Sequence, residues 1–299
     1  MSESLLIVGT GALACLFAAR LSAAGVRVTM LGTWPEGLEA LRAHGVRLAT
    51  DGSEKVYPVQ ATADPGDCVG AHFALVLVKS WQTERAARQL AECLSPDGLA
   101  LTLQNGLGNR ESLERALSAP RVALGVTTTG ATLVGPGRVR PGGEGVISLG
   151  KHPRLDPLAE LLREAGFAVT IVPEADDLLW SKLVINAAIN PLTALLRVPN
   201  GELLNRPPAR ALMGKLAREA ADVAAAMGRQ LTFPDPVAAS EDVAQRTAVN
   251  HSSMFQDILR DAPTEIDAIC GAIVRVGEQC DVPTPVNRTL WLLVKAVRE

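Results

Sequence analysis

The sequence predicts an α/β protein in two parts: a doubly wound parallel sheet, followed by an all-helical domain. Up to Val172, short apolar runs alternate with helix-forming stretches, a pattern typical of parallel strands covered by helices on both faces. From Glu174 onward this alternation is lost, and long stretches rich in Ala, Leu and Arg follow. We therefore place the boundary near Pro173, which gives domains over residues 1–172 and 173–299.

The N-terminal domain is expected to open with a strand, a glycine turn, a helix and a second strand. Leu5–Val8 is a continuous apolar run of the kind found in central parallel strands. The helix-forming stretch Ala12–Ala24 stops at Gly25, and Val26–Leu31 follows as the second strand. The other expected elements are strands at 73–78, 100–103 and 122–126, helices at 83–93 and 110–117, and a hairpin around Pro141–Gly145 that caps the sheet.

The C-terminal domain is expected to consist of helices alone. Its periodic stretches predict helices at 174–197, 210–227, 241–247, 264–279 and 287–297. With 299 residues, 47% of them apolar, the chain is long enough to build a separate core in each domain.

The charge balance argues against a nucleic-acid or membrane partner. The formal net charge is −3, so no basic excess is available to bind phosphate backbones, and aromatic residues make up only 3% of the chain. The apolar stretch Leu5–Val26 lacks a basic leader and is interrupted by glycines and Arg20, so we expect a buried strand and helix rather than a signal peptide or span. The sequence leaves a homodimer open.

The cysteines predict neither a disulfide framework nor a metal site. There are five, an odd number, and no two of them form a Cys-x-x-Cys pair. The four histidines show no metal-ligand spacing beside them. We expect reduced, buried thiols in a cytoplasmic protein, and no metal.

A glycine motif follows the first expected strand. In Gly9-Thr10-Gly11-Ala12-Leu13-Ala14, the first glycine allows a tight turn and the second lets a pyrophosphate approach the backbone. Ala14 is the third small residue, where helix and strand pack closely. A plain tight turn is the alternative, but the β-α-β setting favours a Rossmann-type dinucleotide site with the phosphates at the helix N-terminus.

The choice of cofactor depends on the end of the second strand. NAD-binding sites usually place an acid there, about 20 residues beyond the glycines, to hold the ribose hydroxyls. Here Thr33 occupies that area, with neither an acid nor an arginine beside it. The lack of a carboxylate that would repel a 2′-phosphate favours NADP(H), and NAD(H) is not excluded.

The most informative stretch of the C-terminal domain carries a lysine and two asparagines. Lys182, Asn186 and Asn190 are spaced i, i+4 and i+8, so they share one stripe of a helix that is otherwise apolar. Such a helix is surrounded by protein, and a stripe of structural hydrogen bonds would be the simplest explanation. A buried ammonium, however, needs a carboxylate or a lowered pKa, and both suit proton transfer near neutral pH.

Several motifs together resemble the ketopantoate reductase (2-dehydropantoate 2-reductase) family along essentially the whole chain. Beside the glycine motif, the similar segments are Leu77–Gln82, Leu103–Gly108, Lys182–Asn186, Ile189–Leu195, Pro199–Leu203, and Ser252–Asp257 with Thr264–Asp267. They occur in order across both domains. The resemblance implies hydride transfer from NADPH to the keto carbon of 2-dehydropantoate, in pantothenate and coenzyme A biosynthesis.

The resemblance also implies roles for individual residues. Lys182 is the expected general acid, and Glu265 the carboxylate that holds it. The expected substrate contacts are Asn105, Asn186, Asn190, Asn200 and Ser253, with Ser253 facing the substrate carboxylate. The expected cofactor contacts are the motif residues Gly9, Thr10, Gly11, Ala12, Leu13 and Ala14, together with Thr33, Lys79, Asn105 and Glu265.

Two features depart from the family, and two other functions stay open. Many relatives carry an arginine where Thr33 stands, and Pro141 replaces a residue that is commonly polar. A reductase of another branched 2-keto acid would use the same scaffold. A non-catalytic dinucleotide sensor would keep the fold, although retention of Lys182 and Glu265 argues against it.

Overall fold

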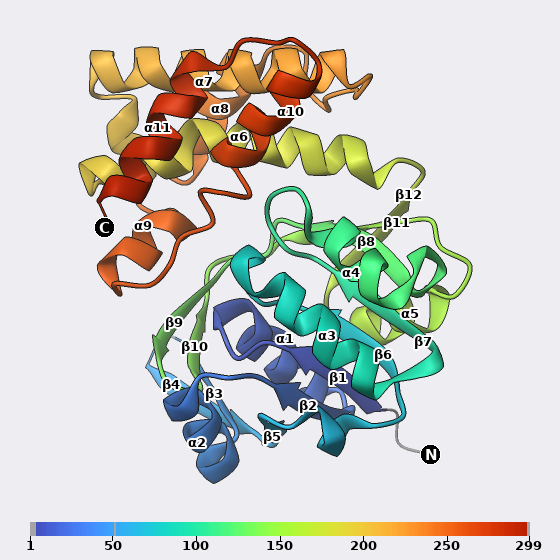
Figure 1. The fold of residues 1–299 in the computed structure, drawn as a ribbon. Helices are drawn as coiled ribbons and strands as arrows, with labels where there is room; N and C mark the ends of the chain where they lie inside the picture. Colours follow the sequence, from blue (N-terminus) through green and yellow to red (C-terminus); the bar gives the residue numbers. More distant parts are fainter. Residues whose placement is uncertain (1–3, 51, 298–299) are drawn as a thin grey trace. The chain divides into compact units, whose positions relative to one another are not determined.

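The structure is a computed structural model that describes residues 4–50 and 52–297. The chain divides into two compact units (Figure 1). The α/β unit holds the residues up to Gln104 together with Asn109–Ala175, and the helical unit holds Asn105–Gly108 together with the residues from Asp176 onward. The short segment Asn105–Gly108 therefore belongs with the helices, although its neighbours on both sides belong to the α/β unit.

The main sheet of the α/β unit has eight strands in the order β12-β11-β8-β7-β6-β1-β2-β5. All neighbours pair in parallel except β8 and β11. The strands are β1 (Ser4–Val8), β2 (Arg27–Leu31), β5 (Gln60–Thr62), β6 (Ala71–Val76), β7 (Leu94–Thr102), β8 (Val122–Thr127), β11 (Val146–Gly150) and β12 (Ala168–Val172). The chain leaves β1 toward β2 and β5, then returns to β6 on its other side. This reversal confirms the doubly wound fold class.

Alternation within the central strand distributes apolar side chains to both faces of the sheet. Leu5 and Ile7 of β1 belong to the core under α1 (Ala12–Ala23) and α5 (Asp156–Glu164). Leu6 and Val8 belong to the core under α3 (Thr83–Cys93) and α4 (Asn109–Leu117). Both faces are thus buried, which explains the continuous apolar run in the sequence.

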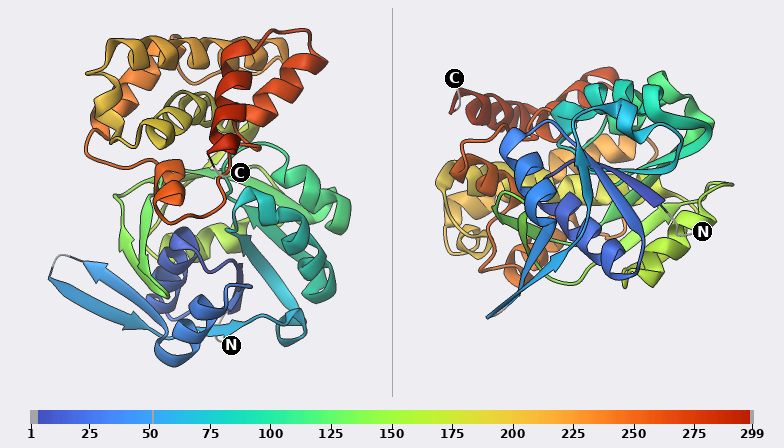
Figure 2. Two further views of the ribbon diagram at one scale, coloured as in Figure 1. Left: turned by 60° about the vertical axis from the view of Figure 1, so that its left-hand side comes forward. Right: turned by 90° about the horizontal axis from the view of Figure 1, so that it is seen from below.

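A second, four-stranded sheet has the order β4-β3-β10-β9, with β3 (Val46–Thr50), β4 (Ser53–Tyr57), β9 (Ala131–Gly135) and β10 (Arg138–Pro141). Its β3 and β4 extend away from the main sheet in the left view of Figure 2. The prediction of a hairpin around Pro141–Gly145 is wrong, because the two strands that flank this segment do not pair with each other. β10 pairs with β9 and β3, whereas β11 pairs with β8 and β12. The glycines there serve close backbone packing instead: a Cβ at Gly145 would lie 2.3 Å from the nitrogen of Thr129.

The helical unit is built around α6 (Ala175–Leu196), whose residues Leu183, Val184, Ala187 and Ala188 are buried in its core. The other helices are α7 (Pro207–Ala226), α8 (Pro236–Arg246), α9 (Ser253–Leu259), α10 (Cys270–Gln279) and α11 (Pro285–Ala296). Among the described helices, α6 alone is long and apolar enough to cross a membrane. Because 72% of its most apolar window is packed inside the structure, the core of this unit accounts for that composition.

The boundaries of several helices differ from the expected ones. A proline at the first helical position starts α7, α8 and α11 earlier than the periodic pattern suggested. The helix expected at 264–279 begins only at Cys270, and Glu265 lies in the turns before it. Neither α9 nor α2 (Pro35–His44) was expected.

Candidate active site

The glycine motif forms a tight turn between β1 and α1. Gly9 has φ +134°, and a Cβ there would lie 3.1 Å from the carbonyl group of Leu77, so only glycine fits without strain. Its N–H donates to the carbonyl of Leu31 at 2.8 Å, which ties the turn to β2. Around Gly11, by contrast, a Cβ would meet nothing within 4 Å, so a ligand can approach the backbone there.

The N-terminus of α1 has the features that a pyrophosphate requires. Gly11 is the N-cap and provides no side-chain hydrogen bond to the first turn. The N–H groups of the first turn, beginning at Ala12 and Leu13, therefore have no partner within the helix. They lie at its N-terminus, where the helix dipole is positive. Ala14 is fully buried between helix and sheet, and Thr10 is buried in the turn. These residues fit a dinucleotide at this position.

Thr33 and Lys79 follow the ends of neighbouring strands in the same unit. Thr33 is exposed and follows Gly32, and the first turn of α2 beyond it carries the exposed acid Glu36. Lys79 follows β6, is half-buried, and caps the short turn Ser80–Gln82 through its backbone. Both lie at the carboxyl edge of the sheet, where ligands of doubly wound folds bind.

Lys182 and Glu265 belong to the helical unit. Lys182 is half-buried on α6, and Glu265, at 5% exposure, is buried in the turns before α10. Burial lowers the pKa of Lys182 to about 8, and the nearby carboxylate of Glu265 opposes part of that shift. An amine with this pKa is mostly protonated at neutral pH and gives up its proton readily, as a general acid must.

Asn105 approaches Glu265 because its loop is held by backbone contacts. The amide of Asn105 donates to Oε2 of Glu265 at 3.4 Å. Two residues on, the N–H of Leu107 donates to the carbonyl of Ala268 at 3.0 Å. Between them, Gly106 has φ +82°, and a Cβ would lie 2.5 Å from the same carbonyl oxygen, so a side chain is excluded. The loop therefore holds Asn105 against the segment that carries Glu265.

Asn186 and Asn190 follow Lys182 along α6, as their spacing predicts. Asn186 is half-buried and Asn190 is 6% exposed. Within residues 4–50 and 52–297, neither side-chain amide has a hydrogen-bond partner. Their polar atoms are not fully enclosed by the protein, so two such groups beside a lysine suit a polar ligand.

Ser253 and Asn200 lie in different surroundings. Ser253 is the half-buried first residue of α9. The amide of Asn200 donates to the hydroxyl of Thr247 at 2.8 Å, and its buried Oδ1 has no partner among the described residues. Asn200 is thus anchored on the protein side, with one acceptor atom left over.

Reasoning from the sequence missed two buried hydroxyl groups beside these residues. Thr193 lies one turn beyond Asn190, and its hydroxyl is 2.7 Å from that of Ser252, the residue before Ser253. The signal was present in Ser252, a typical N-cap residue directly before an apolar run. Its partner Thr193 could not be identified from spacing, because the two residues are 59 positions apart.

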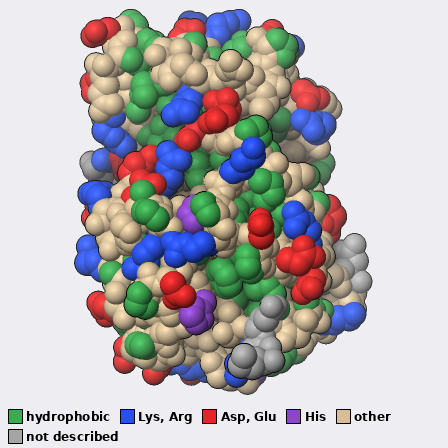
Figure 3. Space-filling view, turned by 90° about the vertical axis from the view of Figure 1, so that its right-hand side faces the viewer, with side chains coloured by type: hydrophobic (Ala, Val, Ile, Leu, Met, Phe, Trp, Pro, Cys, Tyr) green, Lys and Arg blue, Asp and Glu red, His purple; other side chains and the backbone are tan. Residues whose placement is uncertain are grey.

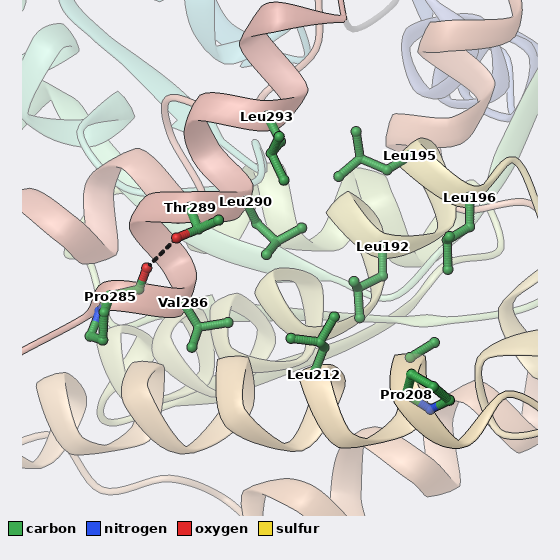
Figure 4. Close-up of a pocket in the computed structure, with 11 residues that line it drawn as sticks. Leu192, Leu195, Leu196, Pro208, Leu212, Pro285, Val286, Thr289, Leu290 and Leu293 are labelled. Carbon is green, nitrogen blue, oxygen red and sulfur yellow. Dashed lines mark hydrogen bonds between the residues drawn. The ribbon is translucent and has the colours of Figure 1, made fainter.

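An apolar groove in the helical unit is separate from these polar residues (Figure 4). Its volume is about 460 Å³, and α6, α7 and α11 line it with Leu192, Leu195, Leu196, Pro208, Ala209, Leu212, Pro285, Val286, Thr289, Leu290 and Leu293. The hydroxyl of Thr289 is bonded to the carbonyl of Pro285 at 2.8 Å, and no lining residue carries a charge. The groove therefore has no group that could transfer a proton.

The charged surface gives no sign of an acidic or basic partner on the face that Figure 3 shows, where the two kinds of side chain are interspersed. Within the described residues, no group of three or more His, Cys, Asp and Glu is arranged to hold a metal ion. The chemistry available among these residues is proton transfer from Lys182 and hydrogen bonding by amides and hydroxyls.

Comparison with known proteins gives consistent results over the whole chain. Residues 5–154 match the family described as "Ketopantoate reductase PanE/ApbA", and residues 174–298 match "Ketopantoate reductase PanE/ApbA C terminal". The 2-dehydropantoate 2-reductase of Archaeoglobus fulgidus is 39% identical, over 97% of this chain and 96% of that protein.

Solved structures show the same architecture. A PanE/ApbA family ketopantoate reductase from Ralstonia eutropha JMP134 has a TM-score of 0.91 and 34% identity, covering 99% of this chain and 98% of that one. A D-mandelate dehydrogenase solved with NADH and anilino(oxo)acetate also has a TM-score of 0.91, at 27% identity and 98% coverage of both chains. Together with the family matches over both units, these similarities show that the chain belongs to the ketopantoate reductase family.

Proposed function

We propose that this protein reduces 2-dehydropantoate to pantoate with NADPH, in the biosynthesis of pantothenate and coenzyme A. The observation that carries the proposal is the half-buried Lys182 with a lowered pKa and Glu265 nearby, in a chain 39% identical to a 2-dehydropantoate 2-reductase. The glycine turn of the α/β unit supplies the dinucleotide site, and the amides of Asn186 and Asn190 supply contacts for a small polar acid.

Lys182 is the general acid in this proposal. When bound, the reduced nicotinamide supplies a hydride to the keto carbon. The carbonyl oxygen gains negative charge as that bond forms, and the ammonium of Lys182 donates its proton to this oxygen. A cation at hydrogen-bond distance from a developing alkoxide lowers the barrier of the reaction.

Glu265 and Asn105 support the lysine. The carboxylate of Glu265 favours the ammonium form, which is the form that donates. Asn105 donates to that carboxylate and so limits its orientation. We assign Asn105 to the border between nicotinamide and substrate, as the resemblance to the family implies.

The remaining contacts orient the substrate. Asn186 and Asn190 offer amide donors and acceptors to its hydroxyl and carbonyl oxygens, and the hydroxyl of Ser253 donates to its carboxylate. Asn200 offers its unpartnered Oδ1 as an acceptor. Uncharged substrate partners leave the ammonium of Lys182 to act on the carbonyl oxygen.

The preference for NADPH rests on the segment after β2. Gly32 and Thr33 place no carboxylate beside the expected position of the ribose. The acid of Glu36 lies further on and is exposed. Thr33 is the proposed contact on this side of the cofactor, whereas Lys79 is assigned to the border between nicotinamide and substrate. The similar D-mandelate dehydrogenase was solved with NADH, which makes NADH the competitor to test.

A single assay tests both the substrate and the cofactor. Oxidation of NADPH and of NADH is followed in parallel, with 2-dehydropantoate, a generic branched 2-keto acid, or the keto acid that corresponds to mandelate. We expect the highest kcat/KM for 2-dehydropantoate with NADPH. An equal kcat/KM for the other acids would contradict the substrate, and an equal or higher value with NADH would contradict the cofactor.

A further inference from the structure

We propose that Thr193 and Ser252 are positioning residues that hold Asn190 and Ser253 at a fixed separation, and so determine how tightly the keto acid binds. The inference rests on the proposed function, in which Asn190 and Ser253 contact the substrate. Neither hydroxyl touches the substrate itself in this proposal.

The two hydroxyls form a buried bridge between two elements of the helical unit. Thr193 on α6 is fully buried, Ser252 is 6% exposed, and their oxygens are 2.7 Å apart. The hydroxyl of Thr193 is also 3.0 Å from the carbonyl oxygens of both Ile189 and Asn190. The hydroxyl of Ser252 accepts from the N–H of Phe255 at 3.1 Å and caps α9. The bridge thus joins the backbone of one proposed substrate residue to the residue directly before the other.

The direction of each hydrogen bond follows from counting protons. A hydroxyl has one proton and two lone pairs. Because the neighbours of Thr193 on α6 are carbonyl oxygens, we assign its proton to them, so that its hydroxyl accepts from Ser252. Because Ser252 accepts from a backbone N–H, its own proton is free to go to Thr193. The series of hydrogen bonds therefore runs from the N–H of Phe255 through Ser252 and Thr193 to the carbonyls of α6. Every donated proton in it has an acceptor.

The bridge lies where α6 has lost one of its own hydrogen bonds. Pro191 has no N–H, so the carbonyl of Ala187 lacks its usual partner four residues on, and the proline ring crowds the same carbonyl. The turn that carries Asn190 is therefore less constrained by the helix itself. The shared proton of Thr193 and its contact with Ser252 supply the missing constraint from a second element.

Removing either hydroxyl is expected to weaken substrate binding without abolishing the chemistry. In Thr193→Val the shape is kept, but the proton of Ser252 loses its buried acceptor. In Ser252→Gly the bridge is lost while an acceptable N-cap remains. We expect each variant to raise KM for 2-dehydropantoate about tenfold, because small displacements of orienting groups weaken binding strongly. We expect kcat and KM for NADPH to change less than about threefold.

Three further variants separate positioning from general stabilisation. Thr193→Ser restores the hydroxyl and should bring KM back to within about twofold of the parent value. Ser240→Ala is the matched control, because Ser240 is a fully buried serine of the same unit whose hydroxyl, among the described residues, bonds only the carbonyl of Pro236. It should lower Tm without changing KM. The double variant Thr193→Val/Ser252→Gly should be no worse than either single variant, because both remove the same bridge.

The outcomes distinguish this inference from the proposed function. If Asn190→Ala and Ser253→Ala raise KM for the keto acid but Thr193→Val and Ser252→Gly lower only Tm, the bridge has no positioning role and the inference is wrong. If Asn190→Ala and Ser253→Ala also leave KM unchanged, the substrate contacts themselves are wrong, and the inference is overturned with them.

Discussion

The glycine turn of the α/β unit and the lysine cluster of the helical unit are built in opposite ways. The turn uses six consecutive residues and acts through the backbone, and four of the six are glycine or alanine. The cluster uses side chains from segments far apart in the chain: Asn105 and Glu265 alone are separated by 160 positions. A backbone site tolerates almost no added atoms, whereas a side-chain site depends on charge and on neighbouring groups.

Loss of the amine should cause the largest effect and would test the cluster directly. We expect Lys182→Ala to lower kcat by roughly two to four orders of magnitude, the usual cost of losing a general acid. NADPH binding, followed by fluorescence titration, should be unchanged, because the turn is built without this residue. Lys215→Ala, which removes an exposed lysine of the same unit, is the control. An unchanged kcat in Lys182→Ala would remove the lysine from the mechanism.

Adding one methyl group to the turn should have the next largest effect. In Gly9→Ala the new Cβ meets the carbonyl of Leu77 at a φ that side chains rarely adopt. We expect KM for NADPH to rise about tenfold to a hundredfold. The pH at which kcat falls on the alkaline side should not change. Gly25→Ala is the control, since Gly25 also has a positive φ but no atom within 4 Å of its Cβ position. Equal losses in the two variants would attribute the effect to backbone strain alone.

The charge of Glu265 should control the pH dependence of turnover. Lys182 donates as an ammonium, so kcat should fall as the pH rises through its pKa of about 8. Glu265 raises that pKa, so Glu265→Gln should move the limb to lower pH and reduce kcat at pH 8 about tenfold. Glu265→Asp keeps the charge and should move the limb less. A limb that stays in place in Glu265→Gln would show that the two residues are not coupled.

The smallest expected effect concerns stability. The pKa of Lys182 is lowered from 10.5 to about 8 by folding, so between these values the unfolded chain binds more protons than the folded one. The free energy of unfolding should therefore rise with pH over this range. Lys182→Met should raise Tm at pH 7 by on the order of 1–3 °C and abolish this dependence. A lower Tm in this inactive variant would mean that the amine stabilises the fold.

The same contrast explains what could be predicted from the sequence. The fold class, the glycine turn and the stripe of Lys182, Asn186 and Asn190 depend on local periodicity, and the structure shows the expected elements. The prediction of a helix from Thr264 was wrong for its first six residues, which form turns rather than a helix. The carbonyl of Ala268 in these turns binds the Asn105–Gly108 loop. This contact joins segments that are far apart in the sequence, so no local pattern predicts it.

The hairpin failed for a related reason. Pro141–Gly145 has the composition of a tight turn, but its glycines allow close approach of a distant backbone at Gly130 and Thr129. A glycine-rich composition indicates that the backbone bends or packs closely, but it does not identify the segment against which it packs. The roles proposed for all the site residues, Lys182 and Glu265 included, remain predictions, since they depend on bound ligands.

The loop Asn105–Gly108 limits how this protein can be divided or recombined. A fragment that starts after Ala175 would retain Lys182 and Glu265 but lack Asn105, and the carbonyl of Ala268 would lose its bond from Leu107. A chimaera joined at that point would combine a Glu265 segment from one parent with a loop from another. Grafts between relatives should therefore exchange residues 105–108 together with the helices, because those four residues fold as part of the second unit.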